Sequence, residues 1–342
     1  MKREIRIIFM GTPEFAVVSL RTLVENDYQV VAVVTTPDKP VGRHGSVLQG
    51  SPVKEYALSM GLPVLQPERL KDEAFIEELR AFKADLQIVV AFRLLPEAVW
   101  DMPRFGTFNL HASLLPQYRG AAPINWAVIH GDKETGVTTF FLTHGIDTGK
   151  IILQHRVAIE DTDNAGTVHD RLMITGADLV LQTVDLIIEH QGNINTIPQE
   201  KLYLDASLLR PAPKLFKDTC RIDWHQPAST IHNFVRGLSP YPAAWTELEM
   251  PDGTLQQMKI YETAVYFDSK ILSSPLNAKP SDSTYKSLPP GSIIADSKTF
   301  LAISTADGII RILSVQMSGK KRLPISTFLN GFKTGLQGLK VK

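Results

Sequence analysis

Six short segments in the first 143 residues are almost entirely apolar, and this pattern restricts the possible folds more than any other feature of the sequence. Strands with one face in water alternate apolar and polar residues, whereas continuous apolar runs indicate a sheet buried on both faces. Helix-like segments separate the runs, which favours a doubly wound α/β domain with its site at the carboxyl ends of the strands. The runs are 5–11, 29–36, 62–66, 86–92, 108–113 and 136–143.

Two helices of this domain are predicted from their ends and their periodicity. The first begins at Thr12-Pro13-Glu14, where threonine is the expected N-cap and proline the first helical residue. The second spans about residues 164–190 and carries an apolar stripe on one face. The stripe consists of Val168, Leu172, Leu179, Val180, Val184 and Ile187.

The alternation of apolar strands and amphipathic helices ends at residue 191. Segment 192–210 has no strong period and is interpreted as a linker. From residue 211 onward, short β-like runs alternate with Pro, Gly, Asp and Ser, which is typical of a small antiparallel β-barrel. We therefore expect a Rossmann-like catalytic domain over 1–191 and an OB-like barrel over 211–342, with a Ser/Pro-rich insertion at 271–290 that has no assigned role.

Charge and composition narrow the class of protein. The chain has no net formal charge, yet residues 1–205 carry −7 and residues 206–342 carry +7, which indicates a polyanionic partner for the C-terminal part. Cys220 is the only cysteine in the sequence, so an internal disulfide and a cysteine-based zinc site are excluded. No apolar run approaches the roughly 20 residues of a membrane helix, and no export signal is recognised. We expect a cytoplasmic protein without membrane contact.

The stretch FNLHASLLPQYRG (108–120) differs from an ordinary buried strand. Side chains two residues apart in a strand share a face, so Asn109 and His111 should point the same way, with backbones roughly 7 Å apart. Asp147 lies in a glycine-flanked loop after another apolar run, and a carboxylate beside an imidazole favours the imidazolium. The alternatives are that His111 is a hydrogen-bonded histidine under a loop and that Asp147 caps a turn.

Three other kinds of site fit this sequence less well. A metal site of His111, His144 and Asp147 lacks close ligand spacing, so no metal is expected. A hydrolytic triad lacks the Gly-x-Ser-x-Gly elbow. A dinucleotide site is disfavoured because the first strand–helix turn, FMGTPEF, has one glycine and an acid where a pyrophosphate would lie.

Two segments, NLHASLLPQYRGAAPINWA (109–127) and ETGVTTFFLTHGIDTGKI (134–151), resemble the formyltransferases that use 10-formyltetrahydrofolate. Further segments resemble those members of the family that act on tRNA, so the resemblance covers nearly the whole chain. These segments are FMGTPEFA (9–16), PDKPVGRHGSVLQGSPVK (37–54), APKLFKDTCRIDW (212–224), RGLSPYPAAWTEL (236–248) and GKKRLPISTFLNG (319–331).

The resemblance implies an enzyme that transfers the formyl group of 10-formyltetrahydrofolate to the amino group of methionine on initiator methionyl-tRNA, for translation initiation. It implies that Asn109, His111 and Asp147 are catalytic. Amide and imidazolium donors would stabilise the oxyanion that forms when the amine attacks, and Asp147 would help to relay the amine proton. The residues implied to contact the folate are Ser113, Leu114, Leu115 and Pro116.

The expected partners are the folate and the tRNA, bound by a monomer. The loop 37–50, with Lys39, Arg43 and His44, is expected to bind the acceptor end of the tRNA. The guanidinium of Arg43 can pair bidentately with a phosphate or a base edge. A basic cluster in the C-terminal domain is expected to hold the tRNA backbone through salt-sensitive contacts. This cluster consists of Lys320, Lys321 and Arg322.

One departure from the family pattern lies before the folate loop. The usual Ala-Tyr-Gly is replaced in AFRLLP (91–96), which is one residue shorter and places Arg93 near the expected pterin pocket. Two rival functions stay open: formyl transfer to a small amine, such as an amino sugar or a glycinamide nucleotide, and a non-catalytic RNA-binding module that kept the fold. The basic C-terminal domain argues against the first, and the intact Asn109, His111 and Asp147 argue against the second.

Overall fold

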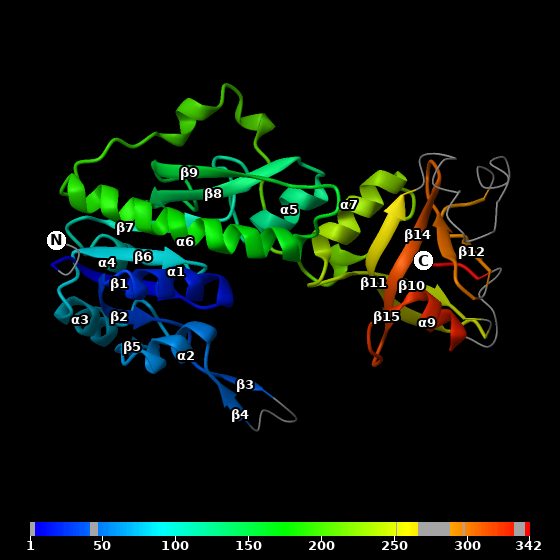
Figure 1. Cartoon of the computed structure of the whole chain (residues 1–342), viewed down its shortest axis with the longest axis horizontal. Coiled ribbons are helices and arrows are strands. Elements are labelled where there is room, and N and C mark those ends of the chain that lie inside the picture. Colours follow the sequence, from blue (N-terminus) through cyan, green and yellow to red (C-terminus); the bar gives the residue numbers. More distant parts are fainter. Residues whose placement is uncertain (1–3, 42–46, 251, 266–287, 297, 332–338) are drawn as a thin grey trace. The chain divides into compact units, whose positions relative to one another are not determined.

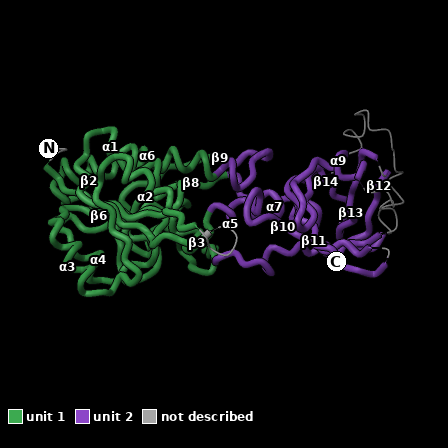
Figure 2. Tube along the Cα trace, turned by 90° about the horizontal axis from the view of Figure 1, so that it is seen from below, with its two compact units in different colours: residues 1–123, 134–158, 169–213 green, residues 124–133, 159–168, 214–342 purple. Residues whose placement is uncertain are grey.

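The computed structural model describes residues 4–41, 47–250, 252–265, 288–296, 298–331 and 339–342. The chain divides into two compact units, coloured green and purple in Figure 2. Unit 1 consists of residues 1–123, 134–158 and 169–213, and unit 2 of residues 124–133, 159–168 and 214–342. Within the described ranges, every helix is too short or too polar to traverse a lipid bilayer.

Unit 1 is built on a seven-stranded sheet with the strand order β5-β2-β1-β6-β7-β8-β9 (Figure 1). The pairs from β5 to β7 are parallel, and the pairs β7–β8 and β8–β9 are antiparallel. The strands are β1 Arg6–Gly11, β2 Gln29–Val34, β5 Val64–Leu65, β6 Leu86–Val90, β7 Thr107–His111, β8 Glu134–Phe141 and β9 Ile151–Ala158. A separate hairpin pairs β3 (Lys39–Val41) with β4 (Val47–Gln49) and stands away from the sheet in Figure 1.

Helices cover both faces of this sheet. The helices of this unit are α1 Glu14–Glu25, α2 Pro52–Ser59, α3 Glu73–Ala81, α4 Glu97–Trp100 and most of α6 Ala165–Glu189. On one face, Met10 and Val89 of the sheet share an apolar cluster with Phe75 of α3 and Val99 of α4. On the other face, α6 approaches β7 so closely that a Cβ at Gly176 would lie 2.8 Å from the Cδ2 atom of Leu110. The predicted doubly wound α/β domain is therefore confirmed.

The long predicted helix is confirmed as α6, and all six residues of its apolar stripe are buried. The predicted start of α1 is wrong by one residue. Pro13, not Thr12, occupies the N-cap position, with φ −81° and ψ 174°. Thr12 and Pro13 connect the end of β1 to α1, and because the backbone of Pro13 is still extended, the helix begins at Glu14. The Thr12 hydroxyl is buried without a hydrogen-bond partner among the described residues.

Unit 2 contains a six-stranded antiparallel sheet in the order β10-β11-β14-β13-β12, with β15 paired to β14. Its strands are β10 Ala244–Glu249, β11 Leu255–Val265, β12 Ile293–Ala295, β13 Leu301–Ser304, β14 Ile309–Met317 and β15 Leu323–Pro324. Its helices are α5 Pro123–Ile129, α7 Ala228–Leu238 and α9 Ile325–Asn330. Trp224, Leu238, Ile260 and Ile312 lie in one buried core, which confirms the predicted antiparallel C-terminal fold. The expected insertion at 271–290 lies almost wholly outside the described residues.

Candidate active site

Strand β7 presents Asn109 and His111 on the sheet face opposite α6. Leu110, between them, points toward α6, and side chains alternate along a strand. The antiparallel pairing sets Asn109 beside Phe140 and His111 beside Thr138 of β8. The two polar side chains therefore emerge together near the carboxyl end of β7, next to the loop that follows it.

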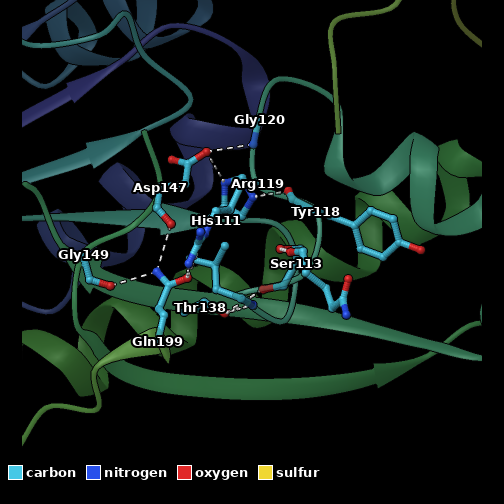
Figure 3. A network of polar contacts seen from close by, with 11 residues as sticks. His111, Ser113, Tyr118, Arg119, Gly120, Thr138, Asp147, Gly149 and Gln199 are labelled. Atoms are coloured by element: carbon cyan, nitrogen blue, oxygen red, sulfur yellow. Dashed lines mark hydrogen bonds and ion pairs between the residues drawn. The ribbon is translucent and has the colours of Figure 1, made fainter. Parts of the chain in front are cut away.

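The His111 ring is held on several sides (Figure 3). Its Nε2 atom lies 2.8 Å from the Tyr118 carbonyl oxygen, which can only accept, so Nε2 is the donor. Its Nδ1 atom faces Oδ2 of Asp147 at 3.8 Å, which is an ion-pair distance rather than a hydrogen bond. The Phe140 ring meets it edge to face, with centroids 6.5 Å apart. The ring is 7% exposed and its orientation is therefore fixed.

Asp147 lies in the loop between β8 and β9 and is fixed by its backbone and its carboxylate. Its φ of +52° lies in the left-handed region, which aspartate tolerates better than most residues. Its Oδ2 atom accepts a hydrogen bond of 2.9 Å from the Gly120 amide. Two residues later, a Cβ at Gly149 would lie 1.6 Å from the Phe141 carbonyl oxygen, so only glycine fits there. The Asp-Thr-Gly turn thus holds one carboxylate against His111.

Asn109 differs from these two residues because its carboxamide has no hydrogen-bond partner among the residues that the structure describes. The residue is half-buried, and the strand on which it lies is rigidly paired on both sides. A strand-held amide of this kind can donate to a ligand without breaking a bond within the protein. The structure thus joins His111 to Asp147 and places Asn109 on the same face of the same strand.

The segment Ser113 to Pro116 is occupied mainly with contacts inside the protein. The Ser113 hydroxyl donates to the Gln117 carbonyl oxygen at 2.6 Å. The Leu115 amide donates to the Thr138 hydroxyl, and its carbonyl accepts from the side chain of Gln154. The Leu115 side chain is 2% exposed and packs in a small apolar cluster, whereas Leu114 is half-buried. Leu114 is therefore the better placed of the two to touch a ligand.

This difference gives a paired prediction for the two leucines. Leu115→Ala should lower the free energy of unfolding by about 2–5 kcal/mol, because it removes a fully buried side chain. Leu114→Ala should destabilise less and raise the KM for the folate several-fold more than the KM for the amine substrate. Thermal or denaturant unfolding and steady-state kinetics measure both effects. A folate KM unchanged by Leu114→Ala would contradict the expectation that this segment contacts the folate.

A residue of the expected linker also belongs to this site. Gln199 is fully buried in the short 3-10 helix Gln199–Leu202 and contacts the loop that carries Asp147. Further along, the Tyr118 amide donates to the Arg210 carbonyl, and the Ala121 amide donates to the Ala212 carbonyl. No local pattern in the sequence marks Gln199 as part of the site, because its segment has no periodicity and Gln199 lies 52 residues from Asp147 in the chain.

The expected tRNA contacts of unit 1 are partly described. Lys39 is exposed on β3, and Arg43 and His44 lie outside the described residues. The hairpin that carries Lys39 is anchored at its base, where Lys54 forms an ion pair of 2.6 Å with Asp38 and Gln66 donates to the same carboxylate at 2.7 Å. These hydrogen bonds from Lys54 and Gln66 lower the pKa of Asp38.

The expected C-terminal contacts lie in the turn between β14 and β15. Lys320 and Lys321 are exposed there. Arg322 is engaged within the unit: its Nε atom donates to the Ser314 hydroxyl at 2.8 Å, and its guanidinium pairs with Glu262. Lys320 and Lys321 are therefore the more available cations of the cluster.

Arg93 and His144, which the sequence also singled out, pair with residues other than His111 and Asp147. The guanidinium of Arg93 donates to the carbonyl oxygens of Pro67 and Glu68, so it holds a neighbouring loop, and burial lowers its pKa. His144 pairs with Glu97 at 3.4 Å. Among the described residues, no group of three or more His, Cys, Asp or Glu side chains is arranged to hold a metal ion.

Comparisons with known proteins agree with this architecture. The family described as formyl transferase matches residues 4–184, and the one described as formyl transferase, C-terminal domain, matches residues 214–333. A protein of Parabacteroides distasonis called methionyl-tRNA formyltransferase is 62% identical over 332 residues, covering 97% of each chain. A protein of the same name from Porphyromonas gingivalis is 53% identical over 333 residues, again covering 97% of each chain.

Solved structures share the fold at low sequence identity. HypX from Aquifex aeolicus, in complex with tetrahydrofolic acid, aligns with a TM-score of 0.61 at 18% identity. The alignment covers 97% of this chain and 48% of HypX, so this chain spans about half the length of that protein. The N-formyltransferase from Helicobacter canadensis aligns with a TM-score of 0.59 at 20% identity, covering 92% of this chain and 99% of that one. With both family domains matched and full-length relatives above half identity, the chain belongs to the formyl transferase family.

Proposed function

We propose that this protein transfers the formyl group of 10-formyltetrahydrofolate to the amino group of methionine on initiator methionyl-tRNA, in the cytoplasm. The product, N-formylmethionyl-tRNA, serves translation initiation. The observation that carries the proposal is the carboxamide of Asn109, unpaired among the described residues, on the strand face that also bears the His111–Asp147 pair. It is supported by relatives named methionyl-tRNA formyltransferase that match 97% of this chain.

The proposed chemistry assigns one task to each of the three residues. The methionine amine attacks the formyl carbon, and the formyl oxygen becomes an oxyanion before the bond to the folate nitrogen breaks. Asn109 donates an N–H to that oxyanion. His111 is proposed to act through its charge rather than as the oxyanion donor expected from the sequence, because its Nε2 atom donates to the Tyr118 carbonyl and its Nδ1 atom faces Asp147. Asp147 accepts the proton that the amine loses, directly or through water, and the folate nitrogen takes up a proton as it leaves.

The remaining assignments concern where the substrates bind. Ser113, Leu114, Leu115 and Pro116 are proposed to shape the folate pocket, with Leu114 as the side chain in contact. Residues 1–191 form the proposed catalytic domain, 192–210 the segment between the domains, and 211–342 the tRNA-binding domain. Arg43 and Lys39 are proposed to hold the acceptor end of the tRNA, and Lys320, Lys321 and Arg322 its backbone. The protein is proposed to act as a monomer and without a metal.

One assay of acceptor preference tests the proposed function. The protein is incubated with 10-formyltetrahydrofolate and, in parallel, with initiator methionyl-tRNA, with uncharged tRNA plus free methionine, and with a nucleotide-linked amino sugar. We expect formylmethionine in the first reaction alone. Transfer to the amino sugar with none to the charged tRNA would replace this function by small-amine formylation.

The proposed backbone contacts give a salt-dependent prediction. Replacing Lys320 and Lys321 by alanine should weaken tRNA binding and flatten the plot of log affinity against log salt, by about 0.7–0.9 for each phosphate that the variant no longer neutralises. Turnover at saturating tRNA should be kept. Lys298→Ala, an exposed lysine in the β12–β13 loop of the same unit, serves as the matched control. Equal slopes for the two variants would mean that Lys320 and Lys321 make no specific contact.

A further inference from the structure

We infer that Gln199 is a positioning residue that sets the place of the Asp147 carboxylate in the active site. The inference rests on the proposed function, since it assumes that Asp147 takes part in catalysis. It adds a role for a buried amide that lies 52 residues beyond Asp147 in the chain, in a segment expected only to connect two domains.

The Gln199 side chain uses both ends of its carboxamide (Figure 3). Its Nε2 atom donates to the carbonyl oxygen of Asp147 at 2.9 Å and to that of Gly149 at 2.8 Å. Its Oε1 atom accepts from Nε of Arg119 at 3.0 Å and from Nη2 of the same guanidinium at 2.6 Å. Two donors and two acceptor sites are the full capacity of an amide side chain. Because Gln199 is 0% exposed, water cannot replace these bonds.

These bonds close a ring around the candidate catalytic carboxylate. Gln199 holds the backbone of Asp147, and Arg119 holds Gln199. Gly120, the neighbour of Arg119, donates its amide to the Asp147 carboxylate at 2.9 Å. Gln199 thus holds the backbone carbonyl of Asp147, and Gly120 holds its carboxylate. The hydrogen bonds between Arg119 and Gln199 connect these two contacts. The loop residues beside it, Ile146 and Thr148, are not buried and offer no comparable packing.

The arrangement has a consequence for rate rather than for substrate affinity. The Nδ1 atom of His111 and Oδ2 of Asp147 are 3.8 Å apart, so a shift of the loop changes the distance and the direction of their interaction. A displacement of about 1 Å in a catalytic group can cost about 100-fold in rate. Gln199 itself is buried behind the loop and is assigned no contact with folate or amine. Its loss should therefore lower kcat and leave both KM values nearly unchanged.

The test uses two variants of Gln199 and one control. Gln199→Met keeps the size of the side chain and removes all four hydrogen bonds. Gln199→Glu keeps an acceptor for Arg119 but replaces the NH2 donor by an oxygen that repels the two loop carbonyls. The control is Gln87→Met, because Gln87 is also 0% exposed and accepts a hydrogen bond from Thr107, at the far end of β7 from His111. The two ends of this five-residue strand are four residue steps apart, a span of about 13 Å.

The measurements are kcat and KM for both substrates in the full-length protein, with the melting temperature of each variant. We expect both Gln199 variants to lose about 100-fold in kcat with KM values within a few-fold of the parent, and Gln87→Met to keep its kcat at a similar melting temperature. If kcat falls in step with melting temperature in all three variants, the role is merely structural and the inference is overturned. Should Gln199→Met not fold, Gln199→Glu decides the matter alone.

A parallel measurement on Asp147→Asn separates this inference from the function on which it rests. If Asp147→Asn is inactive while the Gln199 variants keep normal kcat, the positioning role alone is overturned. If Asp147→Asn keeps normal kcat, the catalytic assignment of Asp147 fails, whatever the Gln199 variants do.

Discussion

Asn109→Ala should lower the rate of formyl transfer about 100- to 1,000-fold, which is the usual cost of removing one donor to an oxyanion. The reason lies in the contacts of this side chain: its carboxamide has no partner among the described residues, yet it stands on a strand paired on both sides. The strand therefore fixes the position of the Asn109 N–H donor before the substrate binds. Single-turnover transfer at saturating concentrations of both substrates measures the effect directly.

We expect Asn109→Ala to remain stable, because the Asn109 carboxamide has no hydrogen-bond partner within the part of the chain that the structure describes. Asn109→Ala breaks no hydrogen bond within the described chain, so its melting temperature should stay close to that of the parent protein. Asn109→Asp is the matched variant, because it keeps the shape and replaces the N–H donor by a charged acceptor. It should be at least as slow as Asn109→Ala. If either variant transfers formyl at a near-normal rate, Asn109 does not stabilise the oxyanion.

Asp147→Asn is expected to lower the rate of transfer by a factor of about 100 to 10,000, the range attributed to a general acid or base. The substitution removes the charge of the side chain and keeps the conformation of the loop. Asparagine tolerates the φ of +52° at this position, and its amide oxygen can still accept from the Gly120 amide. What disappears is the negative charge that faces His111 and that can accept a proton.

Asp147→Ala provides the comparison for the shape of the loop. It removes the charge and the hydrogen bond to Gly120 and leaves a residue less suited to positive φ, so its melting temperature should fall below that of Asp147→Asn. Circular dichroism melts and single-turnover rates compare the two. A rate for Asp147→Asn within a few-fold of the parent, at normal stability, would show that the charge is not used.

Parts of this site were predictable because they depend on local rules. The shared face of Asn109 and His111 follows from the period of two in a strand, and the place of His111 near the strand end follows from the order of the sheet. The buried stripe of α6 follows from the helical period in the same way. These features need no knowledge of what lies elsewhere in the chain.

The features that could not be predicted depend on contacts between distant residues or on backbone detail. Gln199 reaches Asp147 across 52 residues from a segment without periodicity, so nothing local marks it. The engagement of His111 with the Tyr118 carbonyl depends on the path of the loop after β7. The start of α1 lies one residue later than expected because the backbone of Pro13 is extended, a detail that the residue types alone do not determine.

The most direct measurement follows a radiolabelled formyl group from 10-formyltetrahydrofolate to initiator methionyl-tRNA in a single turnover, for the parent protein, Asn109→Ala and Asp147→Asn side by side. We expect label on the methionine amine with the parent protein, and a rate at least about 100-fold lower with each variant at unchanged tRNA affinity. Label on the methionine at equal rates for all three proteins would contradict it.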